Sequence, residues 1–99
     1  MTIRLINHGA EGELIIDGRL DSNTAAEAEE YFMQTAERFD TVILNLGGMD
    51  YISSAGLRVL KRLHMAMRKK DGEMKLSNVN RLVMEVFEMT GFAGLFNIQ

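Results

Sequence analysis

Two adjacent serines, Ser53 and Ser54, stand where an apolar run gives way to a segment with helical spacing. Their hydroxyls could cap that helix, because the N–H groups of a first helical turn lack partners within the helix. The same place could carry a phosphate, since the free N–H groups and the positive end of the helix dipole favour anions. Gly56 lies within the predicted first turn, where glycine is a poor helix former. A glycine is useful there if something approaches the backbone closely. The residues alone leave both hypotheses open, a purely structural cap and a phosphate-accepting site.

Catalysis by a serine would also require a general base, and the chain has two histidines, His8 and His64. His64 follows Ser54 on the same predicted helix at a distance of about 15 Å, which is too far for proton transfer. His8 has no recognisable motif around it, and the chain contains no Gly-x-Ser-x-Gly sequence. The chain has no cysteine, so thiol catalysis, disulfides and thiolate metal sites are excluded. Metal-ligand spacing is absent as well. We therefore predict a protein that is not an enzyme and needs no cofactor.

The elements that would position the serines follow from the hydrophobic pattern, which predicts an α/β chain in the order ββαβαβαβ. The first two strands should pair as an antiparallel hairpin, and the later strands should join the sheet through parallel βαβ crossovers. Asn78 is the expected cap of the third helix and Gly91 its stop. The predicted strands cover residues 3–7, 13–20, 41–46, 73–76 and 94–98, and the predicted helices cover 24–38, 54–70 and 78–90.

Two local patterns add detail to this order. Thr24 with Glu27 three residues later is a capping-box pattern for the first helix. Gly47 and Gly48 after the apolar strand predict a tight turn, and they are not a phosphate-binding loop because no Gly-Lys-Ser/Thr follows. Asp21 is either a turn or cap residue or part of a binding surface, and the sequence leaves both open.

Composition restricts the class of protein further. The chain has 99 residues, 46% of them hydrophobic and 25% charged, which suits one soluble domain over residues 1–99. The net charge of −3 argues against nucleic-acid binding. No apolar run approaches the ~20 residues that span a bilayer, and the N-terminus lacks a secretory layout, so we expect a cytoplasmic protein. Six of the 11 basic residues fall in the second predicted helix, either as a solvated face or as a surface for an anionic partner. They are Arg58, Lys61, Arg62, Arg68, Lys69 and Lys70.

Residues 50–60, Asp-Tyr-Ile-Ser-Ser-Ala-Gly-Leu-Arg-Val-Leu, resemble the signature of the STAS domain, the family of bacterial anti-sigma factor antagonists. The family pattern at this place is Asp-Ser-Ser/Thr-Gly-Leu, and the serine after the aspartate accepts phosphate. Ser53 stands at the aspartate position and Ser54 at the phosphoserine position. Residues 82–92 resemble the family's third helix with its glycine stop. A second group matches the family pattern Gly-x-Leu-Asp-x-x-Thr-Ala, namely Gly18, Leu20, Asp21, Thr24 and Ala25.

The resemblance implies a STAS-like mixed sheet and a partner, an anti-sigma factor that is also a serine kinase of the histidine-kinase-like ATPase fold. The unphosphorylated protein would bind this kinase, and phosphorylation at Ser54 would release it, which regulates sigma-factor-dependent transcription. Ser53 in place of the aspartate favours an alternative, a STAS adaptor without phosphorylation in a transporter or sensory complex. We expect a monomer or a weak dimer, without the family's final helix. The expected partner surface is Asp21, Ser22, Thr24, Ser53, Ser54, Ala55, Gly56 and Arg58.

Overall fold

A computed structural model describes all residues from 1 to 99 and confirms the predicted order of elements. The strands alternate with helices after an initial pair of strands, and one short 3₁₀ turn, η1, precedes the last strand. The elements are β1 (Thr2–Asn7), β2 (Glu11–Leu20), α1 (Ala25–Arg38), β3 (Thr41–Ile52), α2 (Ser54–Lys69), β4 (Glu73–Ser77), α3 (Arg81–Thr90), η1 (Phe92–Gly94) and β5 (Asn97–Ile98).

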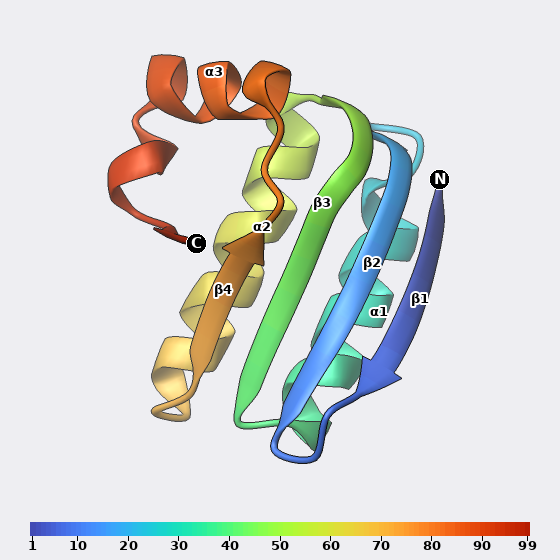
Figure 1. The fold of residues 1–99 in the computed structure, drawn as a ribbon, viewed down its shortest axis with the longest axis vertical. Helices are drawn as coiled ribbons and strands as arrows, with labels where there is room; N and C mark the ends of the chain where they lie inside the picture. The colour runs from blue at the N-terminus through green and yellow to red at the C-terminus, as the bar shows by residue number, and fades with distance from the viewer.

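The strands form one five-stranded mixed sheet in the order β1-β2-β3-β4-β5. β1 pairs with β2 in antiparallel register, and the pairs β2–β3, β3–β4 and β4–β5 are parallel, so the predicted hairpin and crossovers are confirmed. Helices α1 and α2 lie side by side behind the sheet, and α3 lies across one end of it (Figure 1). The opposite face of the sheet carries no helix (Figure 1). None of the helices has the length and apolar character that a membrane crossing requires.

The core lies between the sheet and the first two helices. Alternate side chains of the strands are fully buried, such as Leu14 and Ile16 in β2 and Leu44 in β3. They pack against apolar side chains of α1 and α2, among them Phe32 and Leu60. Helix α3 contributes the buried Val83 and Phe87 to the core, whereas its Leu82 is 55% exposed.

The predicted tight turn at Gly47 and Gly48 is wrong, because β3 continues through both glycines to Ile52. At Gly48 the neighbouring strand explains the glycine. A Cβ atom at this position would overlap the Asp17 carboxylate as it is placed, so the glycine lets that side chain lie over β3 without moving aside. The pairing of β2 with β3 shifts register here and then resumes as far as Leu20 and Ile52. β3 therefore ends at Ile52, immediately before Ser53.

Two predicted helix starts are also corrected. The capping box of α1 does not form, since the Thr24 side chain makes no cap hydrogen bond to the helix. α3 is capped by Asn80, whose side chain accepts the Val83 N–H at 2.9 Å, and not by Asn78. Asn78 instead adopts a left-handed backbone with φ 54°. The predicted glycine stop of α3 is confirmed, because Gly91 ends the helix with φ 84°.

Candidate functional site

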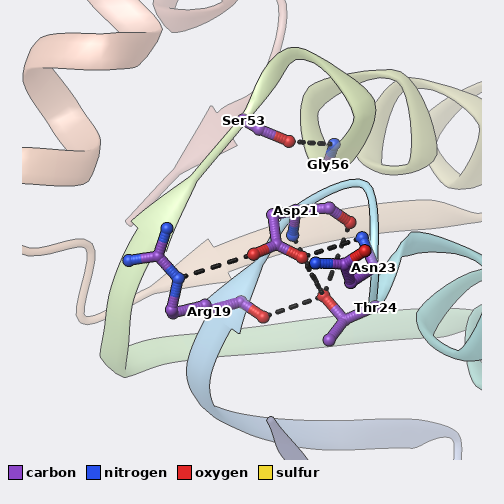
Figure 2. Close-up of polar contacts among 6 residues, drawn as sticks. All are labelled: Arg19, Asp21, Asn23, Thr24, Ser53 and Gly56. Carbon is purple, nitrogen blue, oxygen red and sulfur yellow. Dashed lines mark hydrogen bonds and ion pairs between the residues drawn. The ribbon is translucent and has the colours of Figure 1, made fainter.

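The turns β2–α1 and β3–α2 meet at one end of the sheet. Leu20 and Ile52 are register partners at the ends of β2 and β3. The next residue, Ser53, donates its backbone N–H to the Leu20 carbonyl at 3.0 Å. Figure 2 shows Asp21 beside the start of α2, next to Ser53. Two segments far apart in the sequence thus form one surface, as expected for the carboxyl ends of parallel strands.

Ser53 is the residue that caps α2. Its backbone is extended and its Oγ atom accepts the Gly56 N–H at 3.4 Å (Figure 2). This contact satisfies one of the free donors of the first helical turn. Ser54 is the first residue of the helix and is exposed. Ser53 therefore acts as the cap, and the exposed hydroxyl of Ser54 is not needed for it.

Gly56 is buried directly under the ends of both strands. A Cβ atom at this position would lie 2.7 Å from the Leu20 carbonyl oxygen and 2.9 Å from the Ile52 Cγ1 atom. The expected close approach to its backbone is confirmed, and the approaching group is the protein's own sheet. Gly56 is also among the residues predicted to form the partner surface, and the structure places it buried beneath that surface. It contributes by letting the helix start close to Leu20 and Ile52.

The β2–α1 turn is fixed by hydrogen bonds instead of packing. The Asp21 Oδ1 atom accepts the Asn23 N–H at 2.9 Å. The Thr24 Oγ1 atom accepts the Asp21 N–H at 3.0 Å and donates to the Arg19 carbonyl at 2.9 Å (Figure 2). These bonds occupy the Thr24 hydroxyl and explain why the predicted capping box is absent. Asp21 is thus a turn residue that also lies at the surface.

Neighbouring groups stabilise the ionised form of Asp21. The N–H of Asn23, which bonds to the carboxylate, is the main cause of a lowered pKa of Asp21, and Arg19 lowers it further. The Arg19 Nε atom donates to the Asp21 Oδ2 atom at 3.4 Å (Figure 2). A carboxylate that is ionised at neutral pH therefore lies beside the start of α2. Arg19 was not among the predicted site residues. Its contact with Asp21 follows from the turn, and no sequence signal pointed to it.

The other predicted site residues lie around this centre with different exposures. Ser22 and Arg58 are exposed, and Arg58 lies one helical turn beyond Ser54. Ala55 is half-buried, as are Ser53, Asp21 and Thr24. All of these residues belong to the two turns or to the first turns of α2, so they lie near one end of the sheet.

Both histidines lie elsewhere. His8 bonds through Nε2 to the Glu13 carboxylate at 2.9 Å, near the opposite end of β2 from the two turns. His64 is buried in α2 with an edge-on contact to Phe96, and burial, followed by the nearby charge of Arg68, lowers its pKa. Neither histidine is placed to take a proton from Ser54.

Two of the six basic residues predicted in the second helix serve the fold. The Lys70 Nζ atom donates to the carbonyls of Ala36 at 2.6 Å and Phe39 at 3.1 Å, at the end of α1. Arg62 pairs with Glu29 of α1. These contacts favour a structural use of these two positive charges over a surface for an anionic partner.

Comparison with known proteins identifies the family of this chain. The family model of the STAS domain matches residues 6–99. A protein of Bordetella bronchiseptica named as a candidate anti-sigma factor antagonist, BtrV, is 40% identical over 78 residues, which cover 75% of this chain and 67% of that protein. The anti-sigma-B factor antagonist of Staphylococcus epidermidis is 26% identical over 99 residues, which cover 99% of this chain and 92% of that protein.

Solved structures share the fold at low sequence identity. A candidate anti-sigma factor antagonist from Thermotoga maritima has a TM-score of 0.90 at 16% identity, with 97% of this chain and 84% of that chain covered. The Bacillus cell fate determinant SpoIIAA in its phosphorylated form has a TM-score of 0.76 at 15% identity, with 99% of this chain and 91% of that chain covered. Since the family model spans nearly the whole sequence and the fold is shared, this chain belongs to the STAS domain family.

Proposed function

We propose that this protein is an anti-sigma factor antagonist controlled by phosphorylation of Ser54. In its unphosphorylated form it binds an anti-sigma factor that is also a serine kinase of the histidine-kinase-like ATPase fold. Phosphorylation at Ser54 releases that kinase, and sigma-factor-dependent transcription changes as a result. The exchange takes place in the cytoplasm, and the protein acts as one domain, a monomer or a weak dimer. The observation that carries the proposal is an exposed Ser54 at the start of α2 beside the Asp21 turn.

Relatives support the two parts of this proposal separately. BtrV and the Staphylococcus epidermidis protein carry the name of anti-sigma factor antagonists, which supports the class of partner. SpoIIAA, which shares the fold, is known in a phosphorylated form, which supports a phosphorylated state for a protein of this shape.

The geometry at Ser54 makes a phosphate compatible with the folded protein. A phosphate adds about −1.5 to −2 charges at neutral pH. At the first residue of α2 this charge meets the positive end of the helix dipole. The capping bond from Gly56 to Ser53 does not involve Ser54, so phosphorylation leaves it intact.

The effect of the phosphate falls on the interface with the partner. An unpaired charge buried by the partner costs about 3–5 kcal/mol. That cost corresponds to roughly two to four decades in affinity. The proposed contact surface around Ser54 consists of Asp21, Ser22, Thr24, Ser53, Ala55 and Arg58.

Two variants of Ser54 test the switch. Ser54→Ala should bind the kinase like the wild type and accept no phosphate. Ser54→Asp should bind at least about 10-fold more weakly than the wild type but more tightly than the phosphorylated protein, because aspartate carries less charge than phosphate. Calorimetric titration against the kinase and labelling with radioactive ATP measure both effects. Gln34→Glu is the matched control, since it adds one negative charge on the exposed surface of α1 away from the two turns.

If the Ser54→Asp variant folds normally and binds the kinase as tightly as the wild type, Ser54 is only a structural serine. The alternative of an adaptor without phosphorylation, favoured by Ser53 at the family's aspartate position, predicts binding without labelling of Ser54. The structure gives Ser53 the role of a helix cap, which aspartate fills equally well.

A further inference from the structure

Next to the proposed contact surface, one aromatic and one basic side chain are exposed together on the sheet. The β2–β3 ladder shifts register twice, the second time between Gly18 and Arg19, and this places Arg19 opposite Tyr51. Their neighbours Leu20 and Ile52 are buried on the helix-covered face. Because successive side chains of a strand point to opposite faces, Arg19 and Tyr51 point to the face without helices.

The two side chains hold each other in place. The Arg19 guanidinium carbon lies 4.2 Å from the centroid of the Tyr51 ring, within the range of a cation–π interaction. The same guanidinium bonds to Asp21 through Nε at 3.4 Å, and Asp21 is itself tied to Asn23 and Thr24. The Arg19 side chain nevertheless remains 59% exposed, and Tyr51 is 41% exposed. An exposed aromatic ring and an exposed guanidinium therefore lie in contact with each other in the absence of a partner.

We propose that Arg19 and Tyr51 form an anchor, that is, a pair of side chains that binds the anti-sigma factor kinase named under the proposed function. This inference therefore rests on the proposed function. The anchor is continuous with the switch surface, because Arg19 contacts Asp21 and Asp21 lies beside Ser53. Tyrosine and arginine dominate the binding energy of many protein interfaces. An ordered pair loses little conformational freedom on binding, which favours affinity.

The geometry of this pair also indicates which chemical groups the partner needs in order to bind it. One face of the Tyr51 ring is covered by the guanidinium, so the rest of the ring needs an apolar recess. The guanidinium has five N–H donors, and only the one at Nε is used by Asp21. The partner therefore carries a carboxylate at the edge of this recess, and that carboxylate accepts hydrogen bonds from the remaining N–H groups. In this arrangement the anchor supplies affinity and selects the partner, while Ser54 controls release.

The chain contains a matched control for the tyrosine. Tyr31 on α1 is 42% exposed, nearly the same fraction as Tyr51, and it belongs to a different element. Tyr51→Ala should weaken binding of the unphosphorylated protein to the purified kinase at least 10-fold, whereas Tyr31→Ala should stay within twofold. Arg19→Gln should weaken binding about fivefold and make the dissociation constant less sensitive to salt, since the charge pair with the partner is lost.

Calorimetry at two salt concentrations, with circular dichroism melts of each variant, separates the outcomes. If the wild type binds and Tyr51→Ala binds equally well while folded, the anchor is wrong and the proposed function stands. If the wild type does not bind the kinase at all, the proposed function fails and the anchor fails with it. If Tyr51→Ala changes self-association measured by sedimentation and leaves kinase binding unchanged, the surface holds a second copy of the chain and the proposal is overturned. Should Tyr51→Ala unfold, Tyr51→Phe and Arg19→Gln still test the phenol contact and the charge.

Discussion

The turns β2–α1 and β3–α2 lie side by side, yet different forces hold them. The β3–α2 turn depends on packing and a cap, with Gly56 pressed under the strand ends and Ser53 bonded to the helix. The β2–α1 turn depends on a network of hydrogen bonds around Asp21 and Thr24. The first turn should therefore be sensitive to volume and the second to charge.

This difference also separates the residues that hold the two turns from an exposed residue that does not. In the β2–α1 turn the polar side chains of Asp21 and Thr24 bond within the turn itself. In the β3–α2 turn Gly56 and Ser53 have structural roles, while Ser54 is exposed and is not the cap. A modification at Ser54 can therefore change the surface without disturbing either turn. Three predictions test this contrast, in order of decreasing effect on stability, and a fourth extends the acid measurement to Glu13.

The largest effect is expected from adding a methyl group at Gly56. In Gly56→Ala the new Cβ would meet the Leu20 carbonyl oxygen at 2.7 Å, which forces the helix or the strand to move. Overpacking of this kind costs about 1–3 kcal/mol, and about 1 kcal/mol of it is offset by better helix propensity. Since three atoms lie within 2.9 Å of the new Cβ, the cost should fall in the upper part of that range, and urea denaturation should show a net loss of up to about 2 kcal/mol. Gly94→Ala is the control, because nothing lies within 4 Å of a Cβ there. Equal stability of Gly56→Ala and wild type would refute the packing account.

A smaller effect is expected from the cap. Ser53→Ala removes the acceptor of the Gly56 N–H and should cost about 0.5–1 kcal/mol, since the bond is long at 3.4 Å. Ser54→Ala should change the free energy of unfolding by only a few tenths of the loss expected for Ser53→Ala, because Ser54 is not the cap. Thermal melts of both variants measure the difference. A larger loss in Ser54→Ala than in Ser53→Ala would reverse the assignment of the cap.

The smallest effect concerns the charge in the β2–α1 turn. The pKa of Asp21 is lower in the folded protein than its ordinary value of 3.8, so its contribution to stability is complete above that pH. This contribution is lost as the pH falls through the folded pKa, because the unfolded chain then binds the proton more readily. Asp21→Asn should therefore lose less stability than the wild type on acidification below about pH 4. Melting temperatures measured through this range test the sign.

Acidification also affects the other end of the sheet. The pKa of Glu13 is lowered by its hydrogen bonds to His8 and Asn45, so Glu13→Gln should flatten the same acid limb. Effects of Asp21→Asn and Glu13→Gln should add, because the two carboxylates lie at opposite ends of β2. Parallel acid curves for wild type and Asp21→Asn would show that the hydrogen-bond network does not hold this charge.

Much of the fold could be predicted, because helices and strands follow from periodic patterns of neighbouring residues. The start of the strand before the serines, the helix after them and the stop at Gly91 were correct to within a few residues, whereas that strand continues to Ile52, beyond its predicted end at residue 46. The errors have a common cause. Gly47 and Gly48 predicted a turn, but at Gly48 the glycine accommodates Asp17 of the next strand. Thr24 predicted a cap, but its hydroxyl bonds back to Arg19.

The sequence by itself determined the order of the elements, the exclusion of thiol chemistry and the position of an adjacent pair of serines at a helix start. Only the tertiary structure decided which serine is the cap, what lies over Gly56 and why Arg19 meets Tyr51. The reason is physical. Helix and strand propensities depend on residues a few positions apart, whereas these contacts depend on the register between β2 and β3. That register shifts twice, between Ile15 and Asp17 and between Gly18 and Arg19, and a register exists only once the two strands are paired.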